Sequence, residues 1–403
     1  MATIPVFSSD SEVNGTEESD NIFIINGDNN TLNGLGANDI LSGSGGANTV
    51  LNGGDGADRL IGNQDDILRG GANSDEVDLS LQAVDSAIAA DLENIHNGIG
   101  VAIGGAFVED VERGLISFGT GNDTVTGSSS ASIFLYGYDG NDHLTGDVGG
   151  DSMGGGNGVD VLDGLGGDDL LYAFAPVSFA AYNSSVSLGT PDDPAAKNFL
   201  NGGDGNDTMV GSSAQDFFDG GDGIDTVSYD PETEVAPGVK IDLKRMLQDT
   251  GGSGLDRFTS IENVDGTGGD DVLRGDQGAN SLFGGVGNDF LTGGGGADTL
   301  RGGDGADRFV YKSTAAIDGD RIIDLDNGDF LDLRGIDADT TKGGNQAFKV
   351  VESFRGRAGE LMLTLDTENG QTIATMDLDG DAVADATFYL NGSHVGTPDN
   401  FVL

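Results

Sequence analysis

The chain contains no cysteine and no tryptophan, and it has few basic residues. Without cysteine, disulfides and thiolate metal sites are excluded. Lysine and arginine number 18 against 69 aspartates and glutamates, so the formal net charge is −51. This balance excludes a nucleic-acid backbone as partner and disfavours an anionic membrane surface. No apolar run has the length of a membrane span. The first residues lack the basic and apolar segments of an N-terminal export signal, and we expect none.

Glycine, in contrast, is abundant, with 71 of the 403 residues. Apolar residues make up only 36% of the chain. Taken alone, this composition fits a disordered, self-repelling polymer. The acidic residues nevertheless recur on a fixed period. Because a compact chain of this charge needs counterions, cations are the natural partner.

A nine-residue repeat runs through much of the chain. Read from Gly137, its copies are GYDGNDHLT, GDVGGDSMG, GGNGVDVLD and GLGGDDLLY, with glycine at positions one and four and an apolar residue at position eight. Further blocks start at Gly202 and Gly266, and a looser version occupies the N-terminal stretch. The residues that we predict as metal ligands share position six: Asp39, Asp58, Asp75, Asp123, Asp142, Asp151, Asp160, Asp169, Asp207, Asp216, Asp225, Asp271, Asn280, Asp289, Asp298 and Asp307.

Each feature of the repeat has a physical reason. Glycine permits the backbone angles of a tight turn, which points its carbonyls and the aspartate toward one spot. Position eight is the apolar member of a short strand, and one such residue per repeat buries a core only if coils stack. Oxygen ligands of this kind suit Ca²⁺. Stacked aspartates without a cation would repel one another across about 4.8 Å.

The repeat resembles the consensus GGxGxDxUx of the RTX (repeats-in-toxin) calcium-binding family, over most of residues 15–309. The resemblance implies an all-β fold, a parallel β-roll (β-solenoid) with bound Ca²⁺. In that fold two repeats make one coil, so turns 18 residues apart are neighbours. The implied neighbours include Asp142 with Asp160, Asp151 with Asp169, Asn280 with Asp298, and Asp289 with both Asp271 and Asp307.

The predicted organisation follows the interruptions of the repeat. It comprises an N-terminal tail at 1–14, an irregular block at 15–126 with a long coil insertion at 78–117, a second block at 127–227 with a loop at 172–199, a second long coil insertion at 228–265, a third block at 266–312 and a C-terminal module at 313–403. The two insertions resemble each other, because ADL at 90–92 matches IDL at 241–243 and VER at 111–113 matches IEN at 261–263. Two interpretations stay open, longer coils without calcium and binding loops.

The C-terminal segment follows a different pattern, with DRIIDLDNGDFLDL, MDLDGDAVADATFYLNG and the ending DNFVL. It resembles the β-rich C-terminal module of serralysin-type metalloproteases, which in that family caps the roll and carries the type I secretion signal. An ordinary polar terminus with an apolar end is the alternative for the last residues. Asp377, Asp379, Asp381 and Asp385 have a spacing similar to an EF-hand loop, but the match is incomplete. This segment is either an acidic hairpin turn or a further Ca²⁺ site.

No motif in the sequence supports a catalytic activity. The chain lacks HExxH, and its three histidines, His96, His143 and His394, are scattered. Ser152 stands in a GxSxG pattern, but its neighbours Asp151 and Met153 are positions six and eight of a repeat. Polysaccharide epimerases carry similar modules behind a separate catalytic solenoid, whereas here the repeats begin near Gly15. We therefore predict that the chain is not an enzyme.

The sequence thus predicts a secreted calcium-binding protein of the cell surface or extracellular space, which folds on extracellular Ca²⁺. Its predicted role is structural, as a surface-layer, matrix or adhesion component. The alternative is a polysaccharide-acting enzyme or a non-catalytic accessory module of an exoenzyme. The predicted partners are calcium ions and the type I secretion machinery, with self-association or a cell-surface polysaccharide as further candidates; nucleic acid and a membrane span are excluded.

Overall fold

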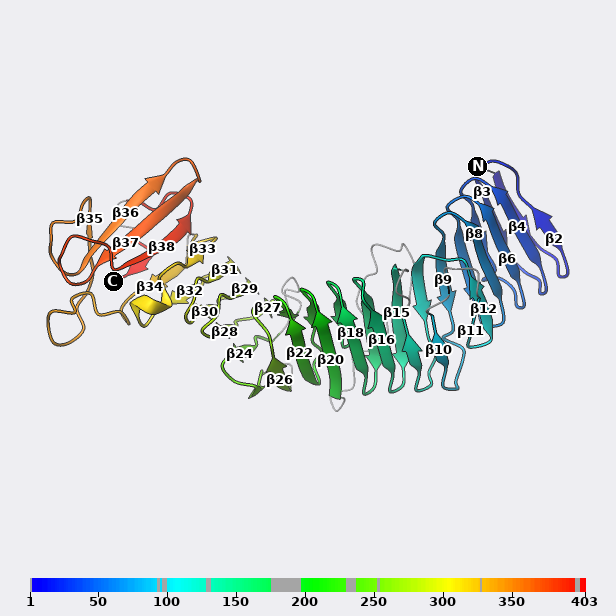
Figure 1. The fold of residues 1–403 in the computed structure, drawn as a ribbon, viewed down its shortest axis with the longest axis horizontal. Coiled ribbons are helices and arrows are strands. Elements are labelled where there is room, and N and C mark those ends of the chain that lie inside the picture. Colours follow the sequence, from blue (N-terminus) through cyan, green and yellow to red (C-terminus); the bar gives the residue numbers. More distant parts are fainter. Residues whose placement is uncertain are drawn as a thin grey trace. The chain divides into compact units, whose positions relative to one another are not determined.

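The computed structural model describes residues 2–92, 95, 100–127, 132–174, 197–229, 237–251, 254–326, 328–395 and 399–403. The regular structure of these residues consists almost entirely of short strands, and their one helical element is a 3₁₀ turn, η1 (Thr314–Ala316). The chain divides into two compact units, Met1–Gly223 and Ile224–Leu403. Figure 1 shows the strands of each unit as successive rungs. The all-β parallel roll predicted from the repeat is confirmed.

The first unit has two sides, each built by strands that pair with the strand one coil earlier. One side is a continuous parallel series of β1 (Ala2–Val6), β3 (Asp20–Ile24), β5 (Ile40–Ser42), β7 (Arg59–Asn63), β9 (Glu76–Ser80), β13 (Arg113–Ser117), β15 (Ser132–Asp139), β17 (Ser152–Asn157), β19 (Leu170–Tyr172) and β21 (Thr208–Val210).

The other side of this unit consists of two parallel series. The first is β2 (Glu12–Asn14), β4 (Thr31–Gly36), β6 (Val50–Asp55), β8 (Ile67–Ala72) and β12 (Ala106–Glu109). The second is β10 (Ala89–Asp91), β14 (Thr124–Thr126), β16 (His143–Asp147), β18 (Val161–Gly166), β20 (Lys197–Asp204) and β22 (Gln215–Asp222). The predicted tail at 1–14 is different in the structure: β1 and β2 form the first coil, and Val6 is buried.

The second unit repeats the arrangement. One side is β23 (Thr226–Ser228), β27 (Asn263–Thr267), β29 (Ser281–Val286), β31 (Thr299–Asp304), β33 (Arg321–Ile322) and β38 (Ala386–Asn391). The other side is β24 (Lys240–Asp242), β28 (Val272–Arg274), β30 (Phe290–Thr292), β32 (Arg308–Val310), β34 (Phe330–Asp332) and β39 (Phe401–Val402).

The core is a ladder of position-eight side chains, stacked from coil to coil. Leu273 pairs with Leu291, which pairs with Phe309, and all three are fully buried. Residues on either side of them point outward, because successive side chains of a strand alternate between faces. Each coil thus adds little apolar area of its own, and stacking is what removes that area from water.

The two long insertions each contain an antiparallel hairpin. In the first, β11 (Val101–Ile103) pairs with β12, and in the second, β25 (Leu247–Asp249) pairs with β26 (Leu255–Thr259). After the hairpin both insertions return to the roll through β13 and β27. Most of the predicted loop at 172–199, with Pro176, Pro191 and Pro194, lies outside the described residues.

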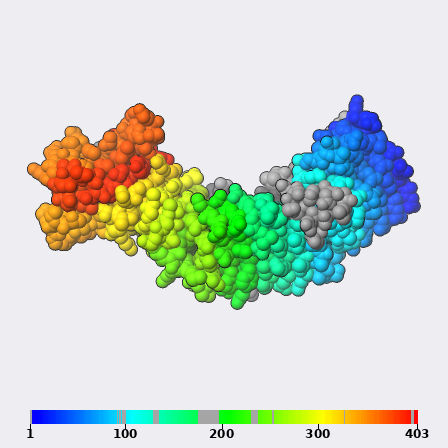
Figure 2. All heavy atoms as spheres, in the orientation of Figure 1, coloured from blue at the N-terminus to red at the C-terminus, as the bar shows by residue number. Residues whose placement is uncertain are grey.

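The C-terminal module overlaps the roll. Its first strands, β33 and β34, add a last coil, so the roll extends past the boundary predicted at residue 312. The remaining strands are β35 (Lys349–Val351), β36 (Glu360–Asp366) and β37 (Gln371–Asp377), and β37 is antiparallel to both β36 and β38. Figure 2 shows these orange and red residues directly beside the yellow coils that they cover. Phe401 and Val402 pair with β34.

Candidate calcium sites

The position-six aspartates stand at the end of each turn, immediately before a strand. In many of the described turns the backbone N–H of one aspartate donates to Oδ1 of the aspartate one coil further on. The distance is 2.9 Å from Asp142 to Asp160 and 2.8 Å from Asp289 to Asp307. One carboxylate oxygen of each residue is therefore fixed by the backbone of its neighbour, which sets the direction of the other.

The second oxygen, Oδ2, lies inside the turn. In Asp39, Asp58, Asp75, Asp142, Asp169, Asp289, Asp298 and Asp307 it is buried and accepts no hydrogen bond from a described residue. These residues are at most 3% exposed. A buried carboxylate oxygen without a donor costs several kcal/mol unless a cation or a proton neutralises it. The series of such oxygens therefore marks the turns as cation sites.

The pKa values of the turn aspartates also indicate cation sites. The pKa of both Asp142 and Asp289 is raised to about 8, chiefly by burial and also by the neighbouring aspartates, against the lowering effect of the backbone N–H. Burial also raises the pKa of Asp75 and of Asp169 to about 7. A divalent cation in the turn would hold these groups ionised at neutral pH.

The donor set fits calcium. Around Gly284, for example, Oδ2 of Asp289 and the carbonyl oxygen of Gly302 border the same small space. Carboxylate and carbonyl oxygens are the ligands of Ca²⁺, which accepts six to eight of them in flexible geometry. Zn²⁺ would require nitrogen or sulfur donors, which the turns do not offer.

Two glycines show why the turn favours glycine at positions one and four. A Cβ at Gly284, position one, would overlap Oδ2 of Asp289, so any side chain there would displace the predicted ligand. Gly287, position four, has φ of 132°, which L-residues rarely adopt. The repeat therefore keeps glycine at the two places where the turn needs it.

The structure brings the predicted residues together in several series, each joined by bonds from a backbone N–H to a carboxylate or amide oxygen. The series within a unit are Asp39–Asp58–Asp75, Asp123–Asp142–Asp160, Asp151–Asp169–Asp207, Asp271–Asp289–Asp307 and Asn280–Asp298. Asp216 accepts from the side chain of Asn198 at 3.1 Å, and Asp225 donates to Glu262 at 2.9 Å. In the first unit some coils are 19 or 17 residues long rather than 18.

The series also contain residues that the sequence reasoning missed. Asp20 donates to Asp39, while Asp298 donates to Asp320 and Asp307 to Asp329, both over 22 residues. These coils lie outside the nine-residue register. A signal was available, because an apolar residue still follows two positions later, as Ile22, Ile322 and Leu331. All three of these apolar side chains are fully buried.

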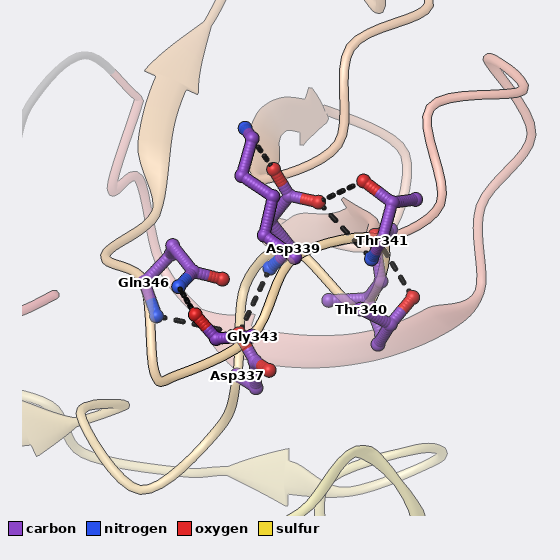
Figure 3. A network of polar contacts seen from close by, with 8 residues as sticks. Asp337, Asp339, Thr340, Thr341, Gly343 and Gln346 are labelled. Atoms are coloured by element: carbon purple, nitrogen blue, oxygen red, sulfur yellow. Dashed lines mark hydrogen bonds and ion pairs between the residues drawn. The ribbon is translucent and has the colours of Figure 1, made fainter.

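Not every buried aspartate belongs to this class. Asp339 is 3% exposed, yet Lys342 pairs with it and Thr341 donates to it (Figure 3). The hydrogen bond from Lys342 lowers the pKa of Asp339. In the same network Gln346 donates its backbone N–H to Asp337 at 3.3 Å, while Thr340 contacts the Leu378 carbonyl outside this loop. Lys342 already balances the negative charge of Asp339, so this buried carboxylate requires no metal ion.

The acidic loop of the C-terminal module is a hairpin turn between β37 and β38. Asp377, Asp379 and Asp385 have oxygens within 4.8 Å of one another. Backbone N–H groups fill both oxygens of Asp377, from Gly380 at 2.7 Å and Ala382 at 3.0 Å. The turn is thus held by its own hydrogen bonds, and a further Ca²⁺ site here stays the second of the two interpretations.

The structure shows the surroundings of three of the residues considered for catalysis. Ser152 is on β17, paired with Phe134 and Leu170, and not on a strand-turn-helix elbow. His143 is exposed on β16. His394 has Nε2 2.8 Å from the carbonyl of Asn391. His96 lies outside the described residues.

A comparison with known protein families agrees with the calcium-binding character of the repeat. The model of the RTX calcium-binding nonapeptide repeat (4 copies) matches residues 24–51, 48–77, 119–153, 154–175, 195–227, 250–291, 265–300 and 283–311, together about half of the chain. The chain belongs to this RTX family. Ca²⁺ is the ion that this family's repeats bind, in agreement with the oxygen-lined turns.

Solved structures similar to the RTX chain include two bacterial proteins. One is a subunit (AlgE6R3) of the Azotobacter vinelandii mannuronan C5-epimerase, 26% identical, with a TM-score of 0.21, covering 33% of this chain and 78% of that one. The other is the extracellular lipase LipA of Serratia marcescens, 16% identical, with a TM-score of 0.20, covering 68% of this chain and 45% of that one. No curated protein matches in sequence. Among the described residues of the RTX chain, no helix is long and apolar enough to cross a membrane.

Proposed function

We propose that this protein is an extracellular structural element whose roll folds when Ca²⁺ fills the turns. The observation that carries the proposal is the repeated burial of carboxylate oxygens that have no described donor, as in Asp142 and Asp289. In a chain of net charge −51, such turns cannot form until a cation or a proton neutralises their carboxylates. Metal binding then contributes directly to the free energy of folding, because the unfolded chain has no preformed site.

The affinity expected for such sites predicts in which compartment the chain folds. Extracellular calcium modules bind with Kd of about 10⁻⁴–10⁻³ M. Calcium in the cytosol is far below this range, so the roll would be unfolded during synthesis and folded outside. An unfolded chain is also the form that a type I exporter would carry, in keeping with the resemblance of the C-terminal segment to a secretion signal.

A structural role is supported by the outer surface of the roll. Stacked coils place like residues in register, and Phe199 of β20 lies on Phe217 of β22 with ring centroids 4.6 Å apart. Phe199 is 42% exposed, so part of this stack faces water. Exposed apolar residues in register on a repetitive face are suited to contacts with further copies or with a matrix polymer.

The experiment is to incubate the purified protein in millimolar Ca²⁺, alone and with an alginate-like polymer, and to follow sedimentation, electron micrographs and polymer turnover. We expect calcium-dependent sheets, fibres or co-sedimentation, all reversed by a chelator. Strictly monomeric protein that leaves the polymer in solution would contradict the structural role. Turnover of the polymer would instead support the enzymatic alternative.

A further inference from the structure

The two long insertions are copies of one structural device. At the start of the first, Ile88 donates its N–H to Asp123 at 2.6 Å, and at the start of the second, Val239 donates to Asp271 at the same distance. Each insertion then forms a hairpin. Each finally passes through a residue in the left-handed region, Asp110 with φ of 53° and Ser260 with φ of 50°.

Two residues after that left-handed residue, each insertion carries a glutamate against a repeat aspartate. Glu112 accepts the N–H of Asp75 through Oε2 at 2.7 Å, and Glu262 accepts the N–H of Asp225 through Oε2 at 2.9 Å. Their backbone N–H groups return a bond to the carbonyls of the same aspartates, at 3.1 and 3.2 Å. In an ordinary coil, the aspartate of the next repeat has this position, as Asp75 does for Asp58.

The first of these turns has the features of the calcium sites. Asp75 is fully buried, and its Oδ2 accepts no hydrogen bond from a described residue. The carbonyl oxygen of Asp110 lies against Gly70, in the place that the Gly70 carbonyl takes against Gly53 one coil earlier. Asp75 thus has a carbonyl near its unpartnered oxygen and a second carboxylate on its backbone N–H, although the nine-residue repeat has ended.

We infer that Glu112 and Glu262 are calcium ligands, each completing a site with Asp75 and Asp225 respectively. The long insertions therefore continue the series of metal sites, in contrast to the interpretation of these coils as calcium-free. A glutamate is one methylene longer than an aspartate, which lets it reach the turn from a backbone that leaves a hairpin. Its Oε2 holds the neighbouring N–H, and we assign Oε1 to the cation. The inference rests on the proposed calcium-dependent folding.

The test compares Glu112→Gln, Glu262→Gln and the double variant with Glu352→Gln, which removes one charge from an exposed position of the C-terminal module. Bound Ca²⁺ is counted by equilibrium dialysis at saturating calcium, and folding is followed by circular dichroism. Glutamine keeps the acceptor for the aspartate N–H, so loss of the cation ligand is separated from loss of the hydrogen bond. We expect one ion fewer in each single variant, two fewer in the double variant and no change in the control.

An unchanged ion count in the double variant would overturn the inference while leaving the proposed function in place. A wild-type protein that binds no calcium would overturn the proposed function itself. If Glu112→Gln fails to fold, Glu112→Asp decides the matter. Recovery of folding and of the missing ion in Glu112→Asp, at a higher calcium concentration, supports ligation. Failure of the aspartate variant as well would assign Glu112 a purely structural role.

Discussion

Asp289 lies between two predicted calcium sites, so a single substitution there should damage both. Its Oδ1 accepts the N–H of Asp271 at 2.8 Å, and its own N–H donates to Asp307 at 2.8 Å. The variant Asp289→Asn keeps an acceptor oxygen of the same shape and removes the charge that faces the cation. Asp289 is fully buried, so no solvent replaces the lost interaction.

The expected size follows from linkage. A ligand at about 100 times its Kd stabilises the folded state by about 2.7 kcal/mol per site. Loss of two sites should therefore lower the free energy of unfolding by about 5 kcal/mol at that calcium concentration. This is a large part of the roughly 5–15 kcal/mol that folded domains have in total.

Urea unfolding at a fixed Ca²⁺ concentration of about 100 times the Kd, followed by circular dichroism, measures the difference. Equilibrium dialysis counts the bound ions in the same samples. The control is Asp219→Asn, which removes one charge from an exposed position on the outer face of β22. An Asp289→Asn protein with wild-type ion count and wild-type unfolding would refute the assignment of the position-six carboxylates as ligands.

Other predictions concern the turn, the core, protons and export. Gly284→Ala should abolish calcium-induced folding of the second unit, because its Cβ would overlap Asp289; calcium titration by circular dichroism checks this. Leu291→Ala should cost about 2–5 kcal/mol in urea unfolding even at saturating Ca²⁺, since Leu291 is fully buried. In chelator, β-structure should decrease as pH rises from about 4 to about 8. The pKa of Asp142 and of Asp289 in the folded state is raised to about 8, so the folded chain retains protons that the unfolded chain releases; a pH titration by circular dichroism that rises instead would contradict the burial argument. Deletion of residues 399–403 should trap the protein inside the producing cell, and normal levels in the medium would exclude a C-terminal signal there.

The sequence predicted the regular part of the molecule well, because each turn and strand there is determined by residues within one nine-residue repeat. Glycine at fixed positions, an aspartate and one apolar residue specify a turn and a strand, and stacking of the coils buries the apolar residue. The buried ladder through Leu273, Leu291 and Phe309 follows directly from this pattern. The neighbouring turns of Asp142 and Asp160 also lie where the 18-residue coil puts them.

What escaped prediction lies where the coil length changes. Asp320 and Asp329 follow their partners by 22 residues, so a fixed register does not find them. Glu112 and Glu262 reach their aspartates after hairpins, and only the folded chain shows that a glutamate can take the place of a repeat aspartate. The similarity between the two insertions was visible in the sequence, but its meaning depends on contacts over 37 residues.

The central claim is that Ca²⁺ is the folding switch of this protein, and a calcium titration followed by far-ultraviolet circular dichroism tests it most directly. The account predicts a disordered spectrum in excess chelator and a cooperative transition to β-structure at calcium of about 10⁻⁴–10⁻³ M. Mg²⁺ should not substitute, since it requires stricter octahedral geometry than these turns offer. A β-rich spectrum in chelator that millimolar Ca²⁺ leaves unchanged would contradict the account.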